Sequence, residues 1–125
     1  MNGLTLDTGA LIAFERNDRR VVAMIARAQE LGLGIAVPAG VVGQAWRDAS
    51  RQVKLVRLLG SDSVKIEPLD DAKARAAGQL CGVSKTRDVI DASVVLCAKT
   101  RGYTVLTSDA EDLRRLDGDV RLVAV

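Results

Sequence analysis

The residues of this sequence that could perform chemistry are four aspartates near helix starts. Asp7 directly follows an apolar run, Asp91 lies near the start of a later helical segment, and Asp109 and Asp112 follow another apolar run. The carboxyl ends of parallel strands share one edge of a sheet, so we expect these carboxylates to converge on one anionic pocket. Two carboxylates about 4 Å apart repel by roughly 4 kcal/mol at an effective dielectric near 20. A divalent cation bound through oxygens removes this cost, so the pattern predicts a metal site.

The sequence contains no histidine. This absence excludes Ser-His-Asp and Cys-His nucleophilic systems, histidine-based ribonuclease chemistry and most zinc sites. Cys81 and Cys97 lie in apolar segments, where we expect them to pack as small hydrophobic residues rather than form a disulfide framework. Any catalysis must therefore use carboxylates.

Each aspartate also has an ordinary structural explanation, because aspartate is a preferred helix N-cap and is favoured in the first turn. Asp7 and Asp109 both occupy such positions. Asp88 and Asp91 are three residues apart at one helix start, so we expect Asp88 to cap while Asp91 faces the sheet edge, although the two could exchange roles. Three separate junctions each supply an aspartate, and a metal site requires these aspartates to cluster, whereas independent caps need not.

Strands and helices that position these carboxylates alternate along the sequence. Apolar runs predict strands at Gly3 to Leu6, Ile35 to Val37, Val64 to Ile66, Tyr103 to Leu106 and Val120 to Val125. Helical spacing and capping residues predict helices at Thr8 to Glu15, Asp18 to Leu31, Pro38 to Trp46 with a continuation from Arg47 to Leu59, Asp70 or Asp71 to Gly82, Asp88 to Arg101, and Asp109 to Leu116. This alternation predicts an α/β fold in which helices cover both faces of a parallel sheet.

Length and composition predict one domain over residues 1–125, with 48% hydrophobic residues to fill its core. The 18 Lys and Arg against 16 Asp and Glu leave a net charge of only +2, so nucleic-acid binding must depend on local patches. There is no long apolar run and no signal-peptide pattern. We therefore expect a cytoplasmic protein without membrane contact.

Three segments carry a family resemblance: Leu6 to Ile12 (Leu-Asp-Thr-Gly-Ala-Leu-Ile), Asp91 to Ala98, and Gly102 to Asp109. In this order they resemble the PIN-domain ribonucleases, specifically the VapC-type toxins of bacterial toxin–antitoxin pairs, over essentially the whole chain. The resemblance implies a Rossmann-like three-layer sandwich and an endoribonuclease that depends on Mg²⁺ or Mn²⁺. It also implies a homodimer that is inhibited by a small antitoxin protein inserted into the acidic groove.

By position, the resemblance makes Asp7, Asp91 and Asp109 metal-binding acids and Asp112 an auxiliary acid. The family's second acid is usually a glutamate, and here Gln44 occupies its place. An amide oxygen can still accept a hydrogen bond, but it brings no charge and cannot act as a base.

Other polar residues are candidates for supporting roles around these acids. Asp48, predicted one helical turn beyond Gln44, or Glu15 on a neighbouring helix could restore the missing acid. We place Thr8, Thr107, Gln44 and Asp88 around the metal-binding acids rather than on the metal.

An RNA substrate also requires nearby cations. Arg47, Arg51 and Lys54 follow helical spacing from Gln44 and predict a basic stripe, which could equally be an ordinary solvated helix face. Lys85 and Arg87 directly precede Asp88 and are expected at the mouth of the site. One Trp, one Tyr and one Phe are too few for a base-stacking platform.

Three alternatives stay open at this level. The first is a relative with the same fold that binds its partners but has lost turnover because Gln44 replaces an acid. The second is a dimeric aspartic protease using Asp7-Thr8-Gly9, in which paired aspartates share a proton. The third is a phosphotransfer receiver domain, which also has an acidic pocket on a parallel sheet.

Overall fold

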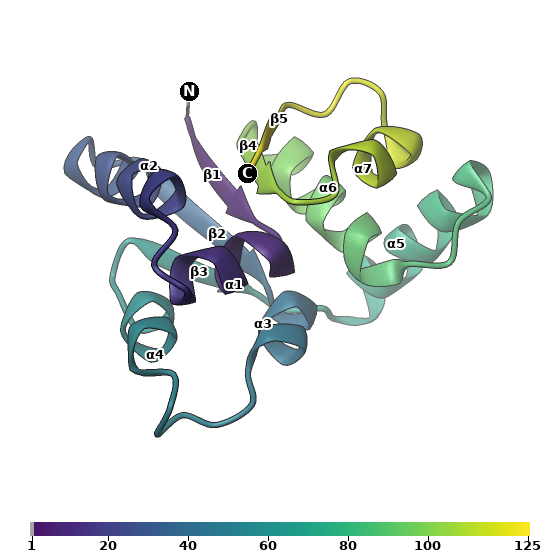
Figure 1. The fold of residues 1–125 in the computed structure, drawn as a ribbon. Coiled ribbons are helices and arrows are strands. Elements are labelled where there is room, and N and C mark those ends of the chain that lie inside the picture. The colour runs from purple at the N-terminus through teal and green to yellow at the C-terminus, as the bar shows by residue number, and fades with distance from the viewer. Residues whose placement is uncertain (1) are drawn as a thin grey trace.

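Five short apolar runs form one parallel sheet in the computed structural model, which describes residues 2–125. The strands are β1 (Gly3–Leu6), β2 (Gly34–Pro38), β3 (Val64–Glu67), β4 (Thr104–Thr107) and β5 (Leu122–Ala124). Their order across the sheet is β3-β2-β1-β4-β5, and every neighbouring pair is parallel (Figure 1). In the central strand, Leu4 pairs with Ile35 on one side and Thr104 on the other. All four residues of β1 are buried, as expected for a parallel strand covered on both faces.

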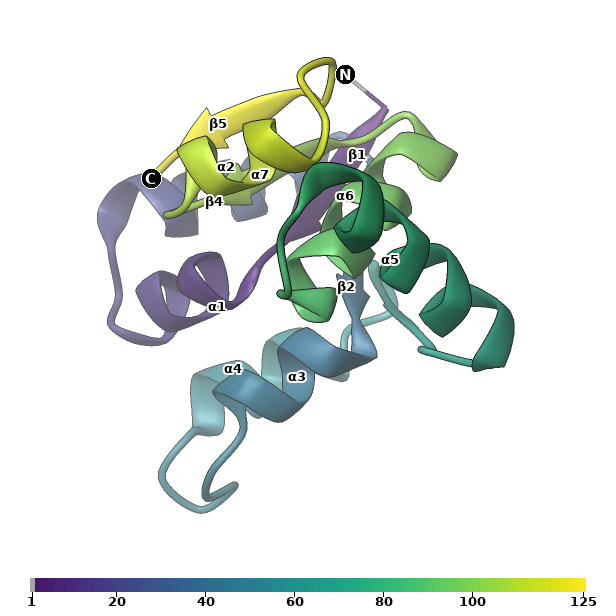
Figure 2. The same ribbon diagram turned by 90° about the vertical axis from the view of Figure 1, so that its right-hand side faces the viewer.

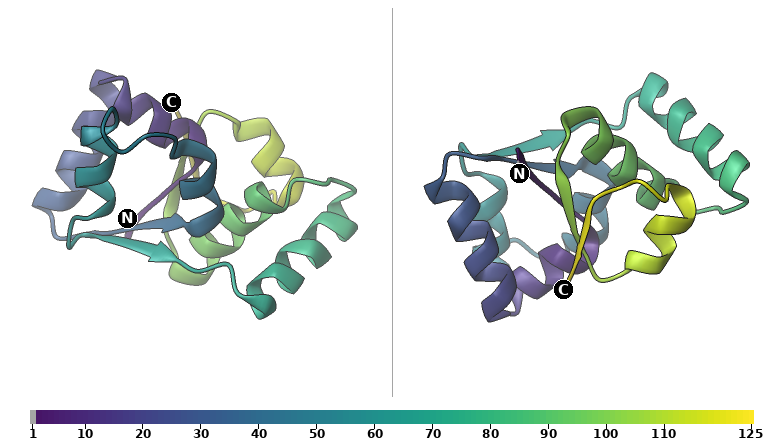
Figure 3. Two further views of the ribbon diagram at one scale, coloured as in Figure 1. Left: turned by 90° about the horizontal axis from the view of Figure 1, so that it is seen from below. Right: turned by 90° about the horizontal axis from the view of Figure 1, so that it is seen from above.

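Helices form the two outer layers of the sandwich. They are α1 (Thr8–Glu15), α2 (Arg19–Glu30), α3 (Ala39–Ala45), α4 (Val53–Leu59), α5 (Asp71–Ser84), α6 (Val89–Arg101) and α7 (Ala110–Leu116). One face of the sheet is covered by α1, α2 and α4, and the other by α6 with α5 and α7 packed against it (Figure 3). This arrangement confirms the predicted three-layer α/β sandwich, with a sheet that is parallel throughout the described residues. No helix within residues 2–125 combines the length and apolarity needed to cross a bilayer.

The carboxyl edge of the sheet is where the strands give way to helices. Figure 2 shows α1, α3 and α6 gathered at this edge, where α3 contacts both of the other helices. The helix that directly follows Asp7 and the parallel sheet exclude the fold of an aspartic protease, which is nearly all strand, so that alternative is wrong. The strand order also differs from the 2-1-3-4-5 order of receiver-like sheets.

Capping residues define the helix ends largely as predicted. Asp18 Oδ1 accepts from the Val21 backbone N–H at 3.1 Å, and Asp70 Oδ1 accepts from that of Lys73 at 2.9 Å. Gly102 ends α6 with a φ of 70°, a left-handed conformation that favours glycine. Cys81 and Cys97 are buried and unpaired, which confirms their prediction as core residues.

The predicted helical continuation from Arg47 to Leu59 is wrong over its first part. The helix α3 ends at Ala45, Trp46 is extended with φ −75° and ψ 129°, and α4 begins only at Val53. Residues 46–52 form a loop, so the expected helical stripe of basic residues does not exist.

The buried side chain of Gln52 explains this loop. Gln52 is 8% exposed, and its Oε1 accepts from the backbone N–H groups of Arg47 at 2.8 Å and Asp48 at 3.0 Å. Its Nε2 donates to the Ala45 carbonyl at 2.9 Å and to Glu15 Oε1 at 3.1 Å. These bonds satisfy backbone groups that a continuous helix would otherwise pair, so the side chain of Gln52 competes successfully with helix formation.

Replacing Gln52 by alanine is expected to destabilise the protein by about 2–3 kcal/mol, because the buried Ala45 carbonyl would lose its donor and two partly buried backbone N–H groups would lose their acceptor. Urea unfolding followed by circular dichroism measures this loss. Gln79→Ala, at an exposed position of α5, is the matched control and should cost little. Equal stability of the two variants would contradict this account of the loop.

Candidate functional site

An acidic pocket lies at the carboxyl edge of the sheet, where the neighbouring strands β1 and β4 end. The acids predicted from separate parts of the sequence meet there. The pocket is lined by Asp7, Thr8, Gly9, Ile12, Gln44, Asp88, Asp91, Ser108, Asp109 and Asp112. The four aspartates therefore line one pocket, as expected.

Asp7 is buried at the base of this pocket, with 3% of its surface exposed. It is the N-cap of α1, and its Oδ1 accepts from the Ala10 backbone N–H at 2.8 Å. Burial raises the pKa of Asp7 above its usual value, while hydrogen bonds from the Thr107 side chain and the Ala10 backbone act in the opposite direction. Asp7 therefore both caps α1 and lines the acidic pocket.

Asp88 and Asp91 divide their roles in the expected way. Asp88 is the N-cap of α6, and its Oδ1 accepts from the Asp91 backbone N–H at 2.9 Å. Asp91 lies in the first turn. Burial, together with the negative charges of Asp88, Asp109, Asp7 and Asp112 in decreasing order, raises the pKa of Asp91 to about 7. The side chain of Asp91 therefore experiences the combined charge of the pocket.

Asp109 and Asp112 enter the pocket from the start of α7. Asp109 is the N-cap residue, but its side chain makes no capping hydrogen bond, so its carboxylate is available to a ligand. Its backbone N–H donates to Thr107 Oγ1 at 2.8 Å. The Thr107 side chain thereby holds the backbone of one acid while also hydrogen bonding with Asp7. Asp112 accepts at Oδ1 from Arg115 Nη1 at 3.4 Å in an exposed ion pair.

Gln44 reaches the pocket from α3, at the position where the family resemblance places an acid. Thr8 Oγ1 donates to Gln44 Oε1 at 2.5 Å, so the amide oxygen is already engaged. Gly40 of α3 lies against the end of the Ile90 side chain of α6, where a Cβ would lie 2.2 Å from Ile90 Cδ1. This contact joins α3, which carries Gln44, to the helix that carries Asp91.

The two residues that could have restored the missing acid do not line the acidic pocket. Asp48 Oδ1 accepts from the backbone and hydroxyl of Ser50 at 3.0 and 2.7 Å, and Asp48 also pairs with Arg51. Glu15 accepts from Gln52. Both carboxylates therefore support the loop between α3 and α4.

The five basic residues predicted to bind RNA also lie outside the lining of this pocket. Arg47 donates to the carbonyls of Gly43 and Trp46 at 3.0 and 2.6 Å, and Lys54 donates to Asn17 Oδ1 at 2.5 Å. Lys85 ends α5 in a left-handed conformation, and Arg87 is exposed directly before the pocket residue Asp88. Arg51 is exposed beside Asp48. Their roles toward RNA stay predictions.

Gly9, Ile12 and Ser108 also line the pocket and were not identified from the sequence. A Cβ at Gly9 would lie 1.8 Å from Ser108 Oγ and 2.7 Å from Ser108 Cβ. The start of α1 and the connection from β4 to α7 therefore touch at this point. The Thr-Gly-Ala motif was the available signal, but its contact with Ser108 depends on the pairing of β1 with β4.

The oxygen donors of the pocket fit a hard divalent cation. Within residues 2–125, however, no three acidic or cysteine side chains are close enough together to enclose a metal ion directly. Mg²⁺ usually retains several waters and takes one or two carboxylates together with substrate oxygens. The repulsion that raises the pKa of Asp91 is a cost that such a cation would remove. The pocket thus fits an open, hydrated Mg²⁺ or Mn²⁺ site rather than a closed cage.

The stabilisation of the protein by Mg²⁺ is expected to increase with pH. An ordinary aspartate titrates near 3.8, whereas Asp91 in the folded protein titrates at about 7. The metal-free fold therefore loses stability as pH rises through this range, because the folded state holds a proton that the unfolded chain has released. A cation competes with that proton. The rise in Tm caused by Mg²⁺ should be larger at about pH 8 than at about pH 6, and an equal rise at both would contradict the prediction.

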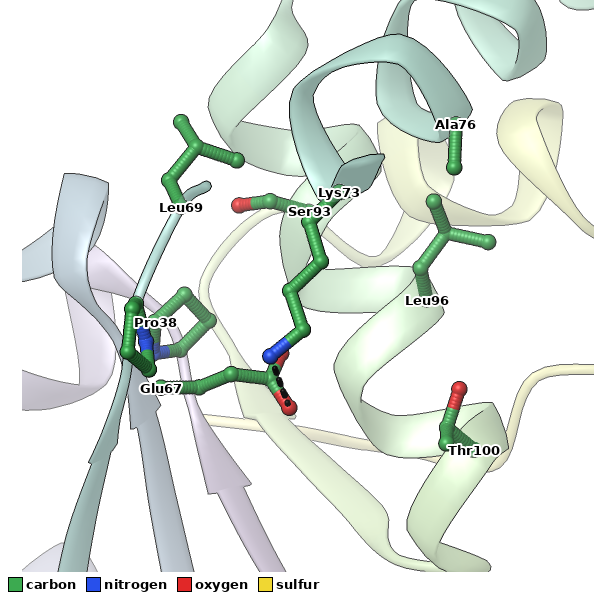
Figure 4. A pocket seen from close by; sticks show the side chains of 9 residues that line it. Pro38, Glu67, Leu69, Lys73, Ala76, Ser93, Leu96 and Thr100 are labelled. Atoms are coloured by element: carbon green, nitrogen blue, oxygen red, sulfur yellow. Dashed lines mark ion pairs between the residues drawn. The ribbon is translucent and has the colours of Figure 1, made fainter. Parts of the chain in front are cut away.

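Another hollow, between β3 and the helices α5 and α6, is lined in part by the paired charges of Glu67 and Lys73 (Figure 4). Glu67 pairs with Lys73 at 3.7 Å, as Figure 4 shows, and with Arg101 at 3.4 Å. Burial, followed by the charge of Glu67, raises the pKa of the Cys97 thiol to about 11, so the thiol is a poor nucleophile. We interpret this hollow as structural, because its ion pairs connect β3 to α5 and α6.

Comparisons with known proteins agree with this fold. A family model described as the PIN domain matches residues 4–119. VapBC2 from Rickettsia felis, bound to a DNA fragment from its promoter, has a TM-score of 0.70 at 15% identity and covers 98% of both chains. FitAB bound to the IR36 DNA fragment has a TM-score of 0.66 at 21% identity, over 97% of this chain and 94% of that one. FitAcB from Neisseria gonorrhoeae has a TM-score of 0.65 at 20% identity, over 95% of each. No curated protein sequence matches significantly.

Proposed function

The chain belongs to the PIN-domain family, whose members are nucleases, and from this premise we propose that it is a divalent-metal-dependent endoribonuclease. The observation that carries the proposal is the convergence of Asp7, Asp91, Asp109 and Asp112 from separate helix starts on one pocket. Helix caps at the strand ends of a parallel sheet would share this edge in any case, so the proposal depends on the carboxylates that are not used as caps, those of Asp91, Asp109 and Asp112. The absence of histidine removes the main metal-independent route to RNA cleavage.

Asp7, Asp91 and Asp109 are the residues that would hold Mg²⁺ or Mn²⁺, with Asp112 assisting at the rim. A bound cation would supply Lewis acidity toward a phosphate oxygen, a lower pKa for an attacking water, and charge stabilisation in the transition state. The protein contributes the fixed positions of its carboxylates. Ala10 and Thr107 hydrogen bond with Asp7, and the cap at Asp88 holds the first turn of α6, from which Asp91 projects.

We further propose that the protein acts as the toxin of a toxin–antitoxin pair. The FitAB and VapBC2 structures are complexes with DNA fragments, and they share the fold of this chain over nearly its whole length. A small antitoxin protein would then bind across the acidic groove, and a homodimer would be the assembly. We propose the cytoplasm as its location, because the proposed RNA substrate would be found there.

Incubating the purified protein with total RNA tests the nuclease proposal. We expect discrete fragments with Mg²⁺ or Mn²⁺, none with a chelator, and none from an Asp7→Asn variant. Asp7→Asn retains an oxygen for the helix cap, so its fold should persist. Fragments that persist in the chelator or in the variant would rule out the proposed site.

A binding-only PIN-fold protein is the second candidate, and Gln44 is the observation that favours it. The engaged amide adds no charge where the family usually has an acid, which leaves fewer anionic donors for a metal. This candidate predicts that the folded, antitoxin-free protein binds RNA but yields no fragments with either metal. Fragments of any discrete length would exclude it.

Gln44→Glu is expected to tighten divalent-metal binding by about tenfold, because affinity for hard cations rises with the number of charged oxygen ligands. The carboxylate can accept the same hydrogen bond from Thr8, so the fold should tolerate the change. Calorimetric titration with Mn²⁺ measures the affinity. Gln79→Glu on α5 makes the same charge change outside the pocket, and an equal effect in both variants would argue against a metal site beside Gln44.

A further inference from the structure

The acidic pocket continues along α1 into a second hollow that leads to Arg16. The two hollows share Gly9, Ile12 and Ser108 in their linings. The second hollow adds Ala13, Arg16 and Asp18. Together they form one groove, called here the α1 groove, with the carboxylates at one end and a cation at the other.

The middle of the α1 groove is neutral. Its shared lining consists of a glycine, an isoleucine and a serine, so no charged side chain separates the acids from Arg16. Ser108 is exposed, and its hydroxyl could contact a ligand that lies in the groove. A polyanionic strand leaving the acidic end would therefore meet no further repulsion until it passed Asp18.

The backbone of Arg16 is held at the end of α1, while its guanidinium has no acidic partner among the described residues. The Arg16 backbone N–H caps α1 by donating to the carbonyls of Ile12 and Phe14, which fixes the start of the side chain. No acidic side chain in residues 2–125 forms an ion pair with Arg16, whereas Arg51, Arg75 and Arg115 each have such a partner. The guanidinium is therefore available for a phosphate.

The length of α1 sets which phosphate Arg16 could reach. The helix has 8 residues, and at 1.5 Å per residue its ends are roughly 12 Å apart. The Arg16 side chain spans part of this backbone separation, and the remainder suits a phosphate of the same strand next to the one that the carboxylates would act on.

We propose that the α1 groove binds the backbone of single-stranded RNA, with Arg16 holding a phosphate next to the one at the acidic pocket. This inference deepens the proposed nuclease function and rests on it for the identity of the substrate. Arg16 is a binding residue that aligns the strand along α1. Asp18, whose Oδ1 caps α2 at Val21, places an opposing charge in the same groove and limits the affinity.

Fluorescence anisotropy of a short labelled single-stranded RNA, in chelator to prevent cleavage, tests the groove directly. Arg16→Gln should weaken binding by about three- to tenfold and reduce the slope of log K against log salt by about 0.7, the value for one phosphate contact on a single strand. Arg16→Lys should retain most of the affinity. Asp18→Asn, which keeps a capping oxygen, should strengthen binding.

Arg75→Gln is the matched control, because it removes one exposed arginine on α5, outside both hollows. Equal RNA affinity of Arg16→Gln and Arg75→Gln would overturn the proposal that the α1 groove binds RNA. In cleavage assays Arg16→Gln should raise KM by the same factor as it weakens binding and leave kcat nearly unchanged.

The two proposals fail in different ways. RNA binding that depends on Arg16, without any cleavage, would refute the proposed nuclease function and support RNA binding in the α1 groove. Metal-dependent cleavage with a KM that is indifferent to Arg16 would refute the groove and keep the nuclease.

Discussion

Replacing Asp91 by asparagine is expected to reduce metal-dependent RNA cleavage by about 100-fold or more while the protein stays folded, because the change removes a central charge from the proposed metal site. Asp91 carries the largest electrostatic load of the pocket, with a pKa of about 7 caused by burial and by four neighbouring aspartates. Removing the charge also removes repulsion, so the metal-free variant should have an equal or higher Tm above neutral pH. Single-turnover cleavage and thermal unfolding measure the two effects.

Asp88→Asn is the matched control for this experiment. The Asp88 side chain caps α6 through its Oδ1, and an asparagine oxygen can accept the same bond. We expect a loss of cleavage within about tenfold, because the variant removes a charge at the rim but keeps the cap. A larger loss in Asp88→Asn than in Asp91→Asn would show that the two residues exchange their proposed roles.

Replacing Gly9 by alanine is expected to destabilise the protein by about 2–3 kcal/mol, because overpacking displaces well-packed neighbours. The new Cβ would lie 1.8 Å from Ser108 Oγ and 2.7 Å from Ser108 Cβ. Helix propensity alone predicts the opposite sign, since alanine is favoured over glycine by about 1 kcal/mol in a helix interior and by less at the first-turn position of Gly9. Urea unfolding therefore shows whether the contact with Ser108 or helix propensity dominates. A Gly9→Ala variant that is more stable than the original protein would contradict the packing found here.

Ser108→Gly should rescue Gly9→Ala, because it removes both atoms that the new Cβ would meet. The pair forms a double-mutant cycle, in which the coupling free energy reports the contact between α1 and the connection from β4 to α7. Additive effects of the two substitutions would show that Gly9 is required for another reason. Gly43→Ala on α3, where a Cβ would meet nothing within 4 Å, is the control and should be tolerated.

The sheet and the acidic junctions could be predicted from the sequence because their signals are local. The apolar run Gly3–Leu6, the cap at Asp7 and the helical spacing that follows are each encoded within a few residues. A parallel sheet then requires that successive strand ends share one edge. The convergence of Asp7 with Asp109 follows from that topology, whereas Asp91 follows α5 rather than a strand and reaches the pocket because α6 packs on β1 and β4.

The loop between α3 and α4 could not be predicted because its main determinant is the burial of one side chain. Arg47, Arg51 and Lys54 have helical spacing, and a local signal of a break is Asp48, whose Oδ1 accepts from the Ser50 backbone N–H two residues on. The break depends on burial of Gln52, which also bonds Glu15, a residue 37 positions away. Arg16 was missed for a similar reason, because only the pairing of β1 with β4 aligns the groove beside α1 with the acids.

The most direct test of the account is the anomalous scattering of Mn²⁺ in crystals of the protein. We expect one strong peak in the pocket formed by Asp7, Asp91 and Asp109, with carboxylate oxygens about 2.1 Å away or linked through water. The peak should disappear in Asp91→Asn crystals. A peak elsewhere on the molecule, or none in the pocket of a protein that cleaves RNA with Mn²⁺, would contradict the claim that these aspartates form the metal site.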